Sequence, residues 1–145
     1  MNLAWLVALA TLVGQPALGE LPGQAVQAES LVVVGQRLAR AWATHDFGGL
    51  TQGASDVLLL LPGAAGPSAL RAGQAAELLR GFTSGTQEVA VDVVVARDVD
   101  RERAYVEVQR VFTVRGTDAR RAQTIYFGLR RTGTGYRLYE VRIVA

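Results

Sequence analysis

The chain has 145 residues, half of them hydrophobic, which suits one folded domain with its own core. All fifteen basic residues are arginine, thirteen residues are acidic, and the formal net charge is only +2. Arginines and acidic residues are interleaved, as over residues 96–110, which is typical of solvated strands and turns and argues against nucleic-acid binding. The lack of cysteine excludes disulfides, thiolate metal sites and a cysteine-linked lipid anchor.

The N-terminal segment predicts an export signal. Residues 3–13 form an apolar run of the length of a signal-peptide core, too short to span a bilayer comfortably. Residues 17–19 supply small side chains at the positions that a signal peptidase reads. We expect removal of residues 1–19, a flexible lead-in over 20–28, and a periplasmic or extracellular protein without a stable membrane span. No basic residue precedes the apolar run, and the alternative is an apolar helix of the folded domain.

Helical spacing dominates the first half of the chain. From Ser30, apolar residues recur every three or four positions up to the glycines at 48–49, and a short second helical turn is expected at 50–54. The apolar run 56–63 ends in Pro-Gly and predicts a buried strand, after which helical spacing returns at 72–82. The residues predicted to face inward are Leu31, Val34, Leu38, Trp42, Ala75, Leu78, Leu79 and Phe82.

The last sixty residues change to strand-like composition. Four runs rich in valine, isoleucine and aromatic residues are joined by short polar connections, which predicts an antiparallel meander. They are residues 89–96, 104–114, 123–131 and 136–144. Helices followed by strands indicate an α+β fold, with the helices packed on one face of a curved sheet. Strict alternation predicts that this face carries Val89, Val91, Val93, Val95, Val106, Val108, Phe112, Ile125, Phe127 and Leu129.

This order of elements resembles the NTF2-like (cystatin-like, cone-shaped) superfamily. The landmarks are the helix end "AWATHDFGGL", the helix "GQAAELLRGF" and the terminal strand "YRLYEVRI". Within the superfamily, residues 29–144 are most similar to small exported bacterial DUF4783-like proteins of unknown function. The resemblance implies an NTF2-like domain over residues 29–145, in the order α-α-β-α-β-β-β-β.

The single histidine, His45, stands directly before Asp46. A catalytic dyad requires the carboxylate to orient the ring, but neighbouring residues at a helix end point in different directions. A histidine at a helix C-terminus also complements the helix dipole, so we interpret the pair as a helix end and turn. One histidine without clustered carboxylates supplies too few metal ligands, and the sequence predicts neither a metal site nor a cofactor.

Enzymes of the ketosteroid-isomerase kind in this superfamily place a carboxylate base inside an apolar cone. Strict alternation puts no carboxylate on the inner face here, because Asp92 falls on the outer face and Glu140 would need a bulge to enter. We therefore predict no catalytic residue.

Two polar residues interrupt the predicted inner face, namely Arg110 and Gln123, and the hydroxyl of Tyr139 is a third candidate. A guanidinium aimed into an apolar cavity is unfavourable unless it is paired, so Arg110 could bind a ligand carboxylate with help from Gln123. The alternative is an arginine at the sheet margin, with its stem on the core and its head in water.

The sequence therefore favours an exported, non-catalytic NTF2-like domain that binds a small ligand or a protein partner. Two alternatives stay open: a pocket enzyme acting on a small apolar molecule, and a structural module that forms a homodimer through its sheet.

Overall fold

The computed structural model describes residues 29–145, so the predicted signal peptide and lead-in lie outside the described residues. The elements, in chain order, are α1 (Leu31–Ala43), α2 (Phe47–Leu50), β1 (Asp56–Leu60), β2 (Ser68–Arg71), α3 (Ala72–Thr83), β3 (Thr86–Asp98), β4 (Arg103–Val114), β5 (Arg120–Arg131) and β6 (Tyr136–Val144). The α+β order expected from the sequence is confirmed, with β2 as an additional short strand and α2 starting earlier than expected.

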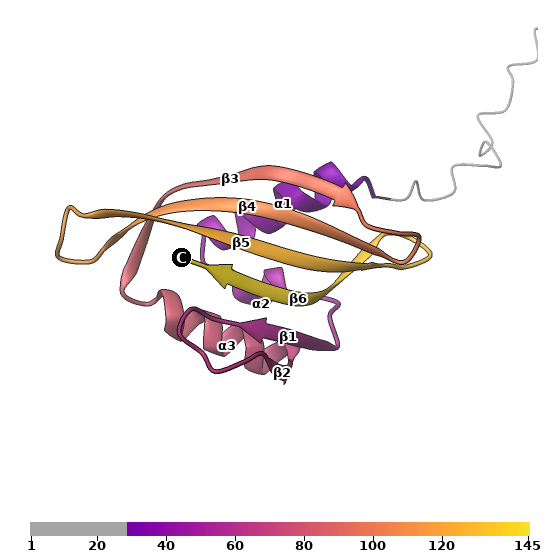
Figure 1. Ribbon diagram of the computed structural model, residues 1–145, viewed down its shortest axis with the longest axis horizontal. Helices are drawn as coiled ribbons and strands as arrows, with labels where there is room; N and C mark the ends of the chain where they lie inside the picture. The colour runs from indigo at the N-terminus through magenta and orange to yellow at the C-terminus, as the bar shows by residue number, and fades with distance from the viewer. Residues whose placement is uncertain (1–28) are drawn as a thin grey trace, which may run out of the picture.

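All six strands form one sheet in the order β2-β1-β6-β5-β4-β3. Every neighbouring pair is antiparallel except β1 and β6, which run parallel. In Figure 1 the long strands curve across the molecule, with α1 and α2 behind them and α3 beside β1 and β2. One face of the sheet is thus covered by helices, and we call the opposite face the outer face. No helix within residues 29–145 has the length and apolar character needed to cross a bilayer.

Helix α1 has the inward stripe that its spacing predicts. The hydroxyl of Ser30 accepts a hydrogen bond from the backbone N–H of Val33 and caps the N-terminus. Val34, Leu38 and Trp42 are almost completely buried along the face that meets the sheet. The predicted burial of this face is confirmed.

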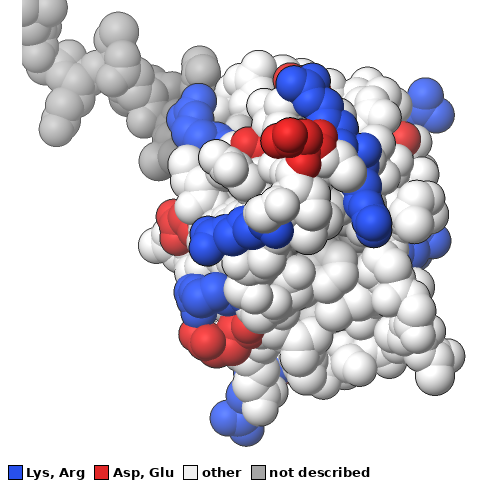
Figure 2. Space-filling model, turned by 90° about the vertical axis from the view of Figure 1, so that its left-hand side faces the viewer, with Lys and Arg blue, Asp and Glu red and all other residues white. Residues whose placement is uncertain are grey.

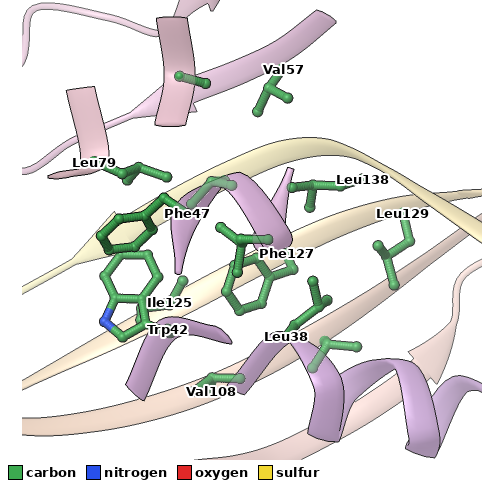
Figure 3. Close-up of a cluster of buried hydrophobic side chains, with 14 of the residues drawn as sticks. Leu38, Trp42, Phe47, Val57, Leu79, Val108, Ile125, Phe127, Leu129 and Leu138 are labelled. Atoms are coloured by element: carbon green, nitrogen blue, oxygen red, sulfur yellow. The ribbon is translucent and has the colours of Figure 1, made fainter. Parts of the chain in front are cut away.

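Side chains fill the space between the helices and the sheet (Figure 3). The ring of Trp42 packs edge-on against Phe47 at 5.2 Å and against Phe127 at 6.3 Å between centroids. Leucines and valines from α3, β1, β4, β5 and β6 complete the cluster. The interior of the cone is therefore a packed core around one tryptophan.

The buried face of helix α3 is narrower than the spacing of its apolar residues predicts. Leu79 and Ala75 are fully buried as expected, and Ala76 and Thr83 join them. Leu78 was expected to face inward, but 45% of its surface is exposed. The expectation was wrong because α3 packs at the edge of the fold, on β1, β2 and α2, so that only a narrow stripe is covered.

Strand β3 departs from strict alternation at two places. The register with β4 shifts between Glu88 and Ala90, which leaves Val89 as an inserted residue, and shifts again between Val93 and Val95. As a result, Val89 is 46% exposed, and Val95 pairs with Glu107 on the outer face. The predicted inward positions of Val89 and Val95 were wrong, because each bulge reverses the facing of the residues beyond it.

Candidate functional site

The first bulge of β3 brings a carboxylate onto the inner face. With Val89 inserted, Glu88 pairs with Phe112 and Val91 pairs with Arg110, so Glu88 and Arg110 share the covered face. The side chain of Glu88 is only 6% exposed, and that of Arg110 is completely buried. The expectation of an inner face without a carboxylate was therefore wrong, and so was the alternative of Arg110 at the sheet margin.

Four hydrogen bonds hold the Arg110 guanidinium. Its Nε donates to Oε2 of Glu88 at 3.1 Å, and its Nη2 donates to Oε1 of the same carboxylate, a bidentate pair. Nη2 also donates to Oγ1 of Thr86 at 3.0 Å, and Nη1 donates to Oε1 of Gln123 at 3.1 Å. Arg110 and Gln123, two residues singled out in the sequence, are thus in direct contact.

Aromatic rings enclose the same guanidinium. Its carbon atom lies 3.9 Å from the centre of the Phe112 ring and 5.4 Å from that of Trp42. Burial lowers the pKa of Arg110, and the charge and hydrogen bonds of Glu88 act in the opposite direction. The guanidinium stays protonated at physiological pH, so the fold contains a buried ion pair.

His45 reaches this pair from the end of α1. It adopts a left-handed conformation with φ of 53°, and its backbone N–H donates to the carbonyl of Trp42. Its ring stacks on Phe47, and its Nε2 lies 3.0 Å from Oε1 of Glu88. Asp46 points elsewhere and caps α2 by accepting from the backbone N–H of Gly49. The helix-end interpretation of "THDFGGL" agrees with this geometry, but the acidic partner of His45 is Glu88.

Glu88 is the residue that sequence reasoning missed. An inward-facing arginine needs a carboxylate, and Glu88 and Asp92 are the acidic residues of β3 close to its pairing position with Arg110. The need of a buried arginine for a nearby carboxylate was the signal in the sequence that could have pointed to Glu88. Periodicity alone could not choose between the two, because it does not reveal a bulge.

The polar groups of this cluster satisfy one another. Glu88 receives Arg110 and His45, and the guanidinium has protein acceptors on all three of its nitrogens. Among residues 29–145, the buried polar side-chain atom without a partner is Nε1 of Trp42. We call these contacts the buried ion-pair network. Its geometry suits a structural role, because its charges already have partners within the chain.

Tyr139, the third predicted site residue, lies on the other side of the sheet. It is the inserted residue of β6 opposite the shift between Gly128 and Leu129. A Cβ atom on Gly128 would come within 3.0 Å of the Tyr139 ring, so the glycine lets that ring lie against the sheet. The structure therefore brings Arg110 and Gln123 together and separates Tyr139 from them.

Tyr139 borders a groove of about 400 Å³ on the outer face, which we call the outer groove. Strands β4, β5 and β6 supply its side chains, and the register sets them in two rows. One row crosses the sheet from Tyr105 over Gly128 to Glu140, and the other from Glu107 over Tyr126 to Arg142. The ring of Tyr139 occupies the space over Gly128, and the hollow of the groove lies among the side chains of the two rows.

Charges elsewhere on the surface are mixed. Figure 2 shows the end of the molecule at which β4 and β5 are joined, where basic and acidic side chains lie next to one another beside a broad uncharged area. Within the part of the chain that the structure describes, no group of three histidine or acidic side chains is placed to hold a metal ion.

The strand order and the helix packing are those of the NTF2-like fold, and comparison with solved structures supports this. A DUF4783 family protein from Bacteroides ovatus aligns with a TM-score of 0.61 and 14% identity, over 74% of this chain and 90% of that one. A ketosteroid isomerase-like protein from Erwinia carotovora atroseptica aligns with a TM-score of 0.62 and 15% identity, over 78% and 91%.

A third solved structure comes from a protein that is itself assigned to the NTF2-like family. It is a proposed dehydratase from the NTF2-like family of Streptomyces avermitilis, which aligns with a TM-score of 0.59 and 15% identity, over 78% of this chain and 91% of that one. The chain thus has the NTF2-like fold and resembles the DUF4783 proteins, as its sequence predicted. No protein-family profile and no curated protein matches the sequence.

Proposed function

We propose that this chain is an exported, non-catalytic NTF2-like domain that binds a small ligand in the outer groove. The observation that carries the proposal is the contrast between its two polar sites. The buried guanidinium has all its partners within the chain, whereas the charged groups of the outer groove are partly or fully exposed and have no ion pair among the described residues. Export rests on the sequence of residues 1–19.

The size and lining of the outer groove support a small-ligand site. Its volume of about 400 Å³ lies within the range of roughly 300–1,000 Å³ of small-molecule sites. Tyrosine rings form much of its walls and polar groups stand among them, a combination that gives both contact area and orientation. The rigid central strands of the sheet hold these side chains in place.

The buried ion-pair network supports a non-catalytic role. A general base must offer a lone pair to a substrate proton. Both carboxylate oxygens of Glu88 already accept hydrogen bonds from Arg110, and only 6% of the Glu88 side chain is exposed. A substrate entering the cone would have to displace the core around Trp42.

One observation favours a second candidate, a pocket enzyme. His45 and Glu88 form a histidine–carboxylate pair, and 28% of the His45 side chain is exposed. In such an enzyme Glu88 would orient the ring, and the second ring nitrogen would exchange a proton with the substrate. The geometry favours the first candidate, because Arg110 competes for the same carboxylate oxygen.

A binding screen of the full chain separates these functions. We would measure the affinity of a panel of neutral, cationic and anionic ring compounds for the native chain, for Tyr126→Leu and for Val33→Ala, a control on the exposed side of α1. At least one compound should bind the native chain and the control equally and Tyr126→Leu about tenfold more weakly.

Other results of the screen would overturn the proposal. Binding that His45→Ala abolishes and Tyr126→Leu leaves intact would place the site in the cone and favour the enzyme. A dimer that covers Tyr126, detected by sedimentation velocity and by loss of binding on dimerisation, would favour the structural module. Absence of binding by every compound would also contradict a small-ligand site.

The proposed export has its own test. The mature protein recovered from the native host should begin at or shortly after Glu20 and lie outside the cytoplasm, as measured by intact mass spectrometry of cell fractions. An uncleaved chain in the cytoplasmic fraction would contradict export and leave the proposal about the outer groove standing.

A further inference from the structure

We infer that the outer groove takes a neutral, hydroxyl-rich ring of the saccharide class, held between the carboxylates of Glu107 and Glu140 and the guanidinium of Arg142. This inference rests on the proposed function and adds the chemical class of the ligand. It follows from the placement of the charges, from their lack of partners and from the shape of the hollow.

Opposite charges lie in this groove without neutralising one another. In one row, Glu107 and Arg142 stand on either side of Tyr126. Glu140 ends the other row, in which it is the neighbour of Gly128. Within residues 29–145, neither carboxylate has an ion pair or a side-chain hydrogen bond, although both are only partly exposed. Acceptors and a donor therefore face one small volume and are free to bind.

Arg142 is fixed in a position where it can donate. Its guanidinium carbon lies 4.7 Å from the centre of the Tyr126 ring, a cation–π contact. A cation–π contact uses none of the N–H donors in a hydrogen bond, so they are available to a ligand. Arg130 lies in the same manner over Tyr139, at 4.6 Å from the ring centre.

A hydroxyl-rich neutral molecule matches this set of groups better than an ion does. Carboxylates only accept hydrogen bonds and a guanidinium only donates them, whereas each hydroxyl does both. A cation would satisfy Glu107 and Glu140 but be repelled by Arg142, and an anion would meet the reverse situation. Neighbouring hydroxyls on one ring can serve both kinds of group.

The shape of the groove fits a ring. The ring of Tyr139 covers Gly128 and forms part of the lining of the hollow. Tyr105 pairs with Gly128 across the strands and borders the hollow on the β4 side. A saccharide ring has polar edges and C–H faces, so its edges would meet the charged groups while one face packs on Tyr105.

The test uses three substitutions that remove a charge and leave an unbranched, flexible side chain in its place. Three neutral disaccharides, cellobiose, maltose and N,N′-diacetylchitobiose, are titrated calorimetrically into the full native chain and its variants. The variants are the double variant Glu107→Met/Glu140→Met, Arg142→Met and the control Glu102→Met on the β3–β4 turn. Benzyltrimethylammonium and phenylacetate serve as cationic and anionic ring compounds. Circular dichroism melting of each variant identifies any that fails to fold, and single Glu107→Met or Glu140→Met replaces a misfolded double variant.

The direction of the changes identifies the ligand class. At least one disaccharide should bind the native chain and the control equally, and both the double carboxylate variant and Arg142→Met about tenfold more weakly. Tighter cation binding in Arg142→Met, with no disaccharide bound, would overturn the saccharide class but keep the groove as a site. Tighter phenylacetate binding in the double carboxylate variant, with no disaccharide bound, would likewise overturn the saccharide class and keep the groove as a site. Binding that none of these substitutions changes would contradict both the inference and the proposed function.

Discussion

Glu88 and Arg110 face each other on the covered side of the sheet because Val89 is an inserted residue in β3. It has no pairing partner in β4 and interrupts the regular alternation between Glu88 and Ala90. Without the insertion, Glu88 would be on the same side as Ala90, which pairs with Val111. The bulge therefore joins two charges that would otherwise lie on opposite faces. It changes a buried arginine from a free ligand group into half of an internal pair.

The ion pair gives the first prediction. Arg110→Met should lower the free energy of unfolding by about 3–5 kcal/mol, because Glu88 would be left buried without its partner. Adding Glu88→Leu should restore most of this loss, since two apolar side chains then replace the two charges. Urea denaturation of the two variants measures both steps. If Arg110→Met alone were as stable as the native chain, the ion pair between Arg110 and Glu88 would not contribute to stability.

The bulge gives the second prediction. Val89→Ser should change stability by no more than about 0.5 kcal/mol, because Val89 is exposed. Val91→Ser should lower it by about 1–3 kcal/mol, because Val91 packs against the core. Thermal melting of this matched pair reports the facing of β3 directly. Similar losses of stability in both variants would mean that the strand alternates without a bulge, with Val89 and Val91 on the same face.

His45 gives the third prediction. Glycine adopts a φ of 53° freely, so His45→Gly should stay within about 1 kcal/mol of the native chain despite losing the contact to Glu88. His45→Val should be about 1–3 kcal/mol less stable, because a β-branched residue is strained in this conformation. Equal stabilities in urea would argue against the left-handed turn.

Asp100 gives a prediction about pH. Its carboxylate accepts hydrogen bonds from the backbone N–H groups of Glu102 and Arg103 and from the Arg103 guanidinium. These contacts, the Glu102 N–H foremost, hold the pKa of Asp100 below its ordinary value. A depressed pKa in the folded state gives stability that is present above the unfolded pKa and is lost as pH falls through the folded pKa.

The native chain should therefore exceed Asp100→Ala in stability near neutral pH, and the difference should shrink below about pH 4. Denaturation midpoints measured over this pH range test the prediction. A difference that does not change with pH would mean that the hydrogen bonds persist with the protonated carboxyl.

The parts of the fold that periodicity controls were predictable from the sequence. The stripe from Val34 to Trp42 shows which face of α1 is buried, and the runs of valine and aromatic residues mark the four long strands. Strand β2 was missed because its four residues are mostly exposed and carry no alternating pattern. Its pairing with β1, rather than its own composition, makes it a strand.

The candidate site was predictable only in part, for a physical reason. Arg110 stood out because a charge interrupts an apolar face, and Gln123 because it shares that face. Glu88 and Tyr139 depend on bulges, and an inserted residue changes facing without changing composition. The same limitation explains why Tyr139 was grouped with Arg110 although the sheet separates them.

The central claim, that the interior charges are structural and the ligand site is outside, can be tested in one NMR titration of the full chain. The Nε–H of Arg110 and the indole N–H of Trp42, assigned with Arg110→Met and Trp42→Phe, report on the interior. Both should exchange slowly with solvent and keep their chemical shifts when phenylacetate, a carboxylate on an apolar ring, is added in large excess. A saturable shift of the Arg110 signal, with faster exchange, would show that a ligand reaches the guanidinium and would contradict the account.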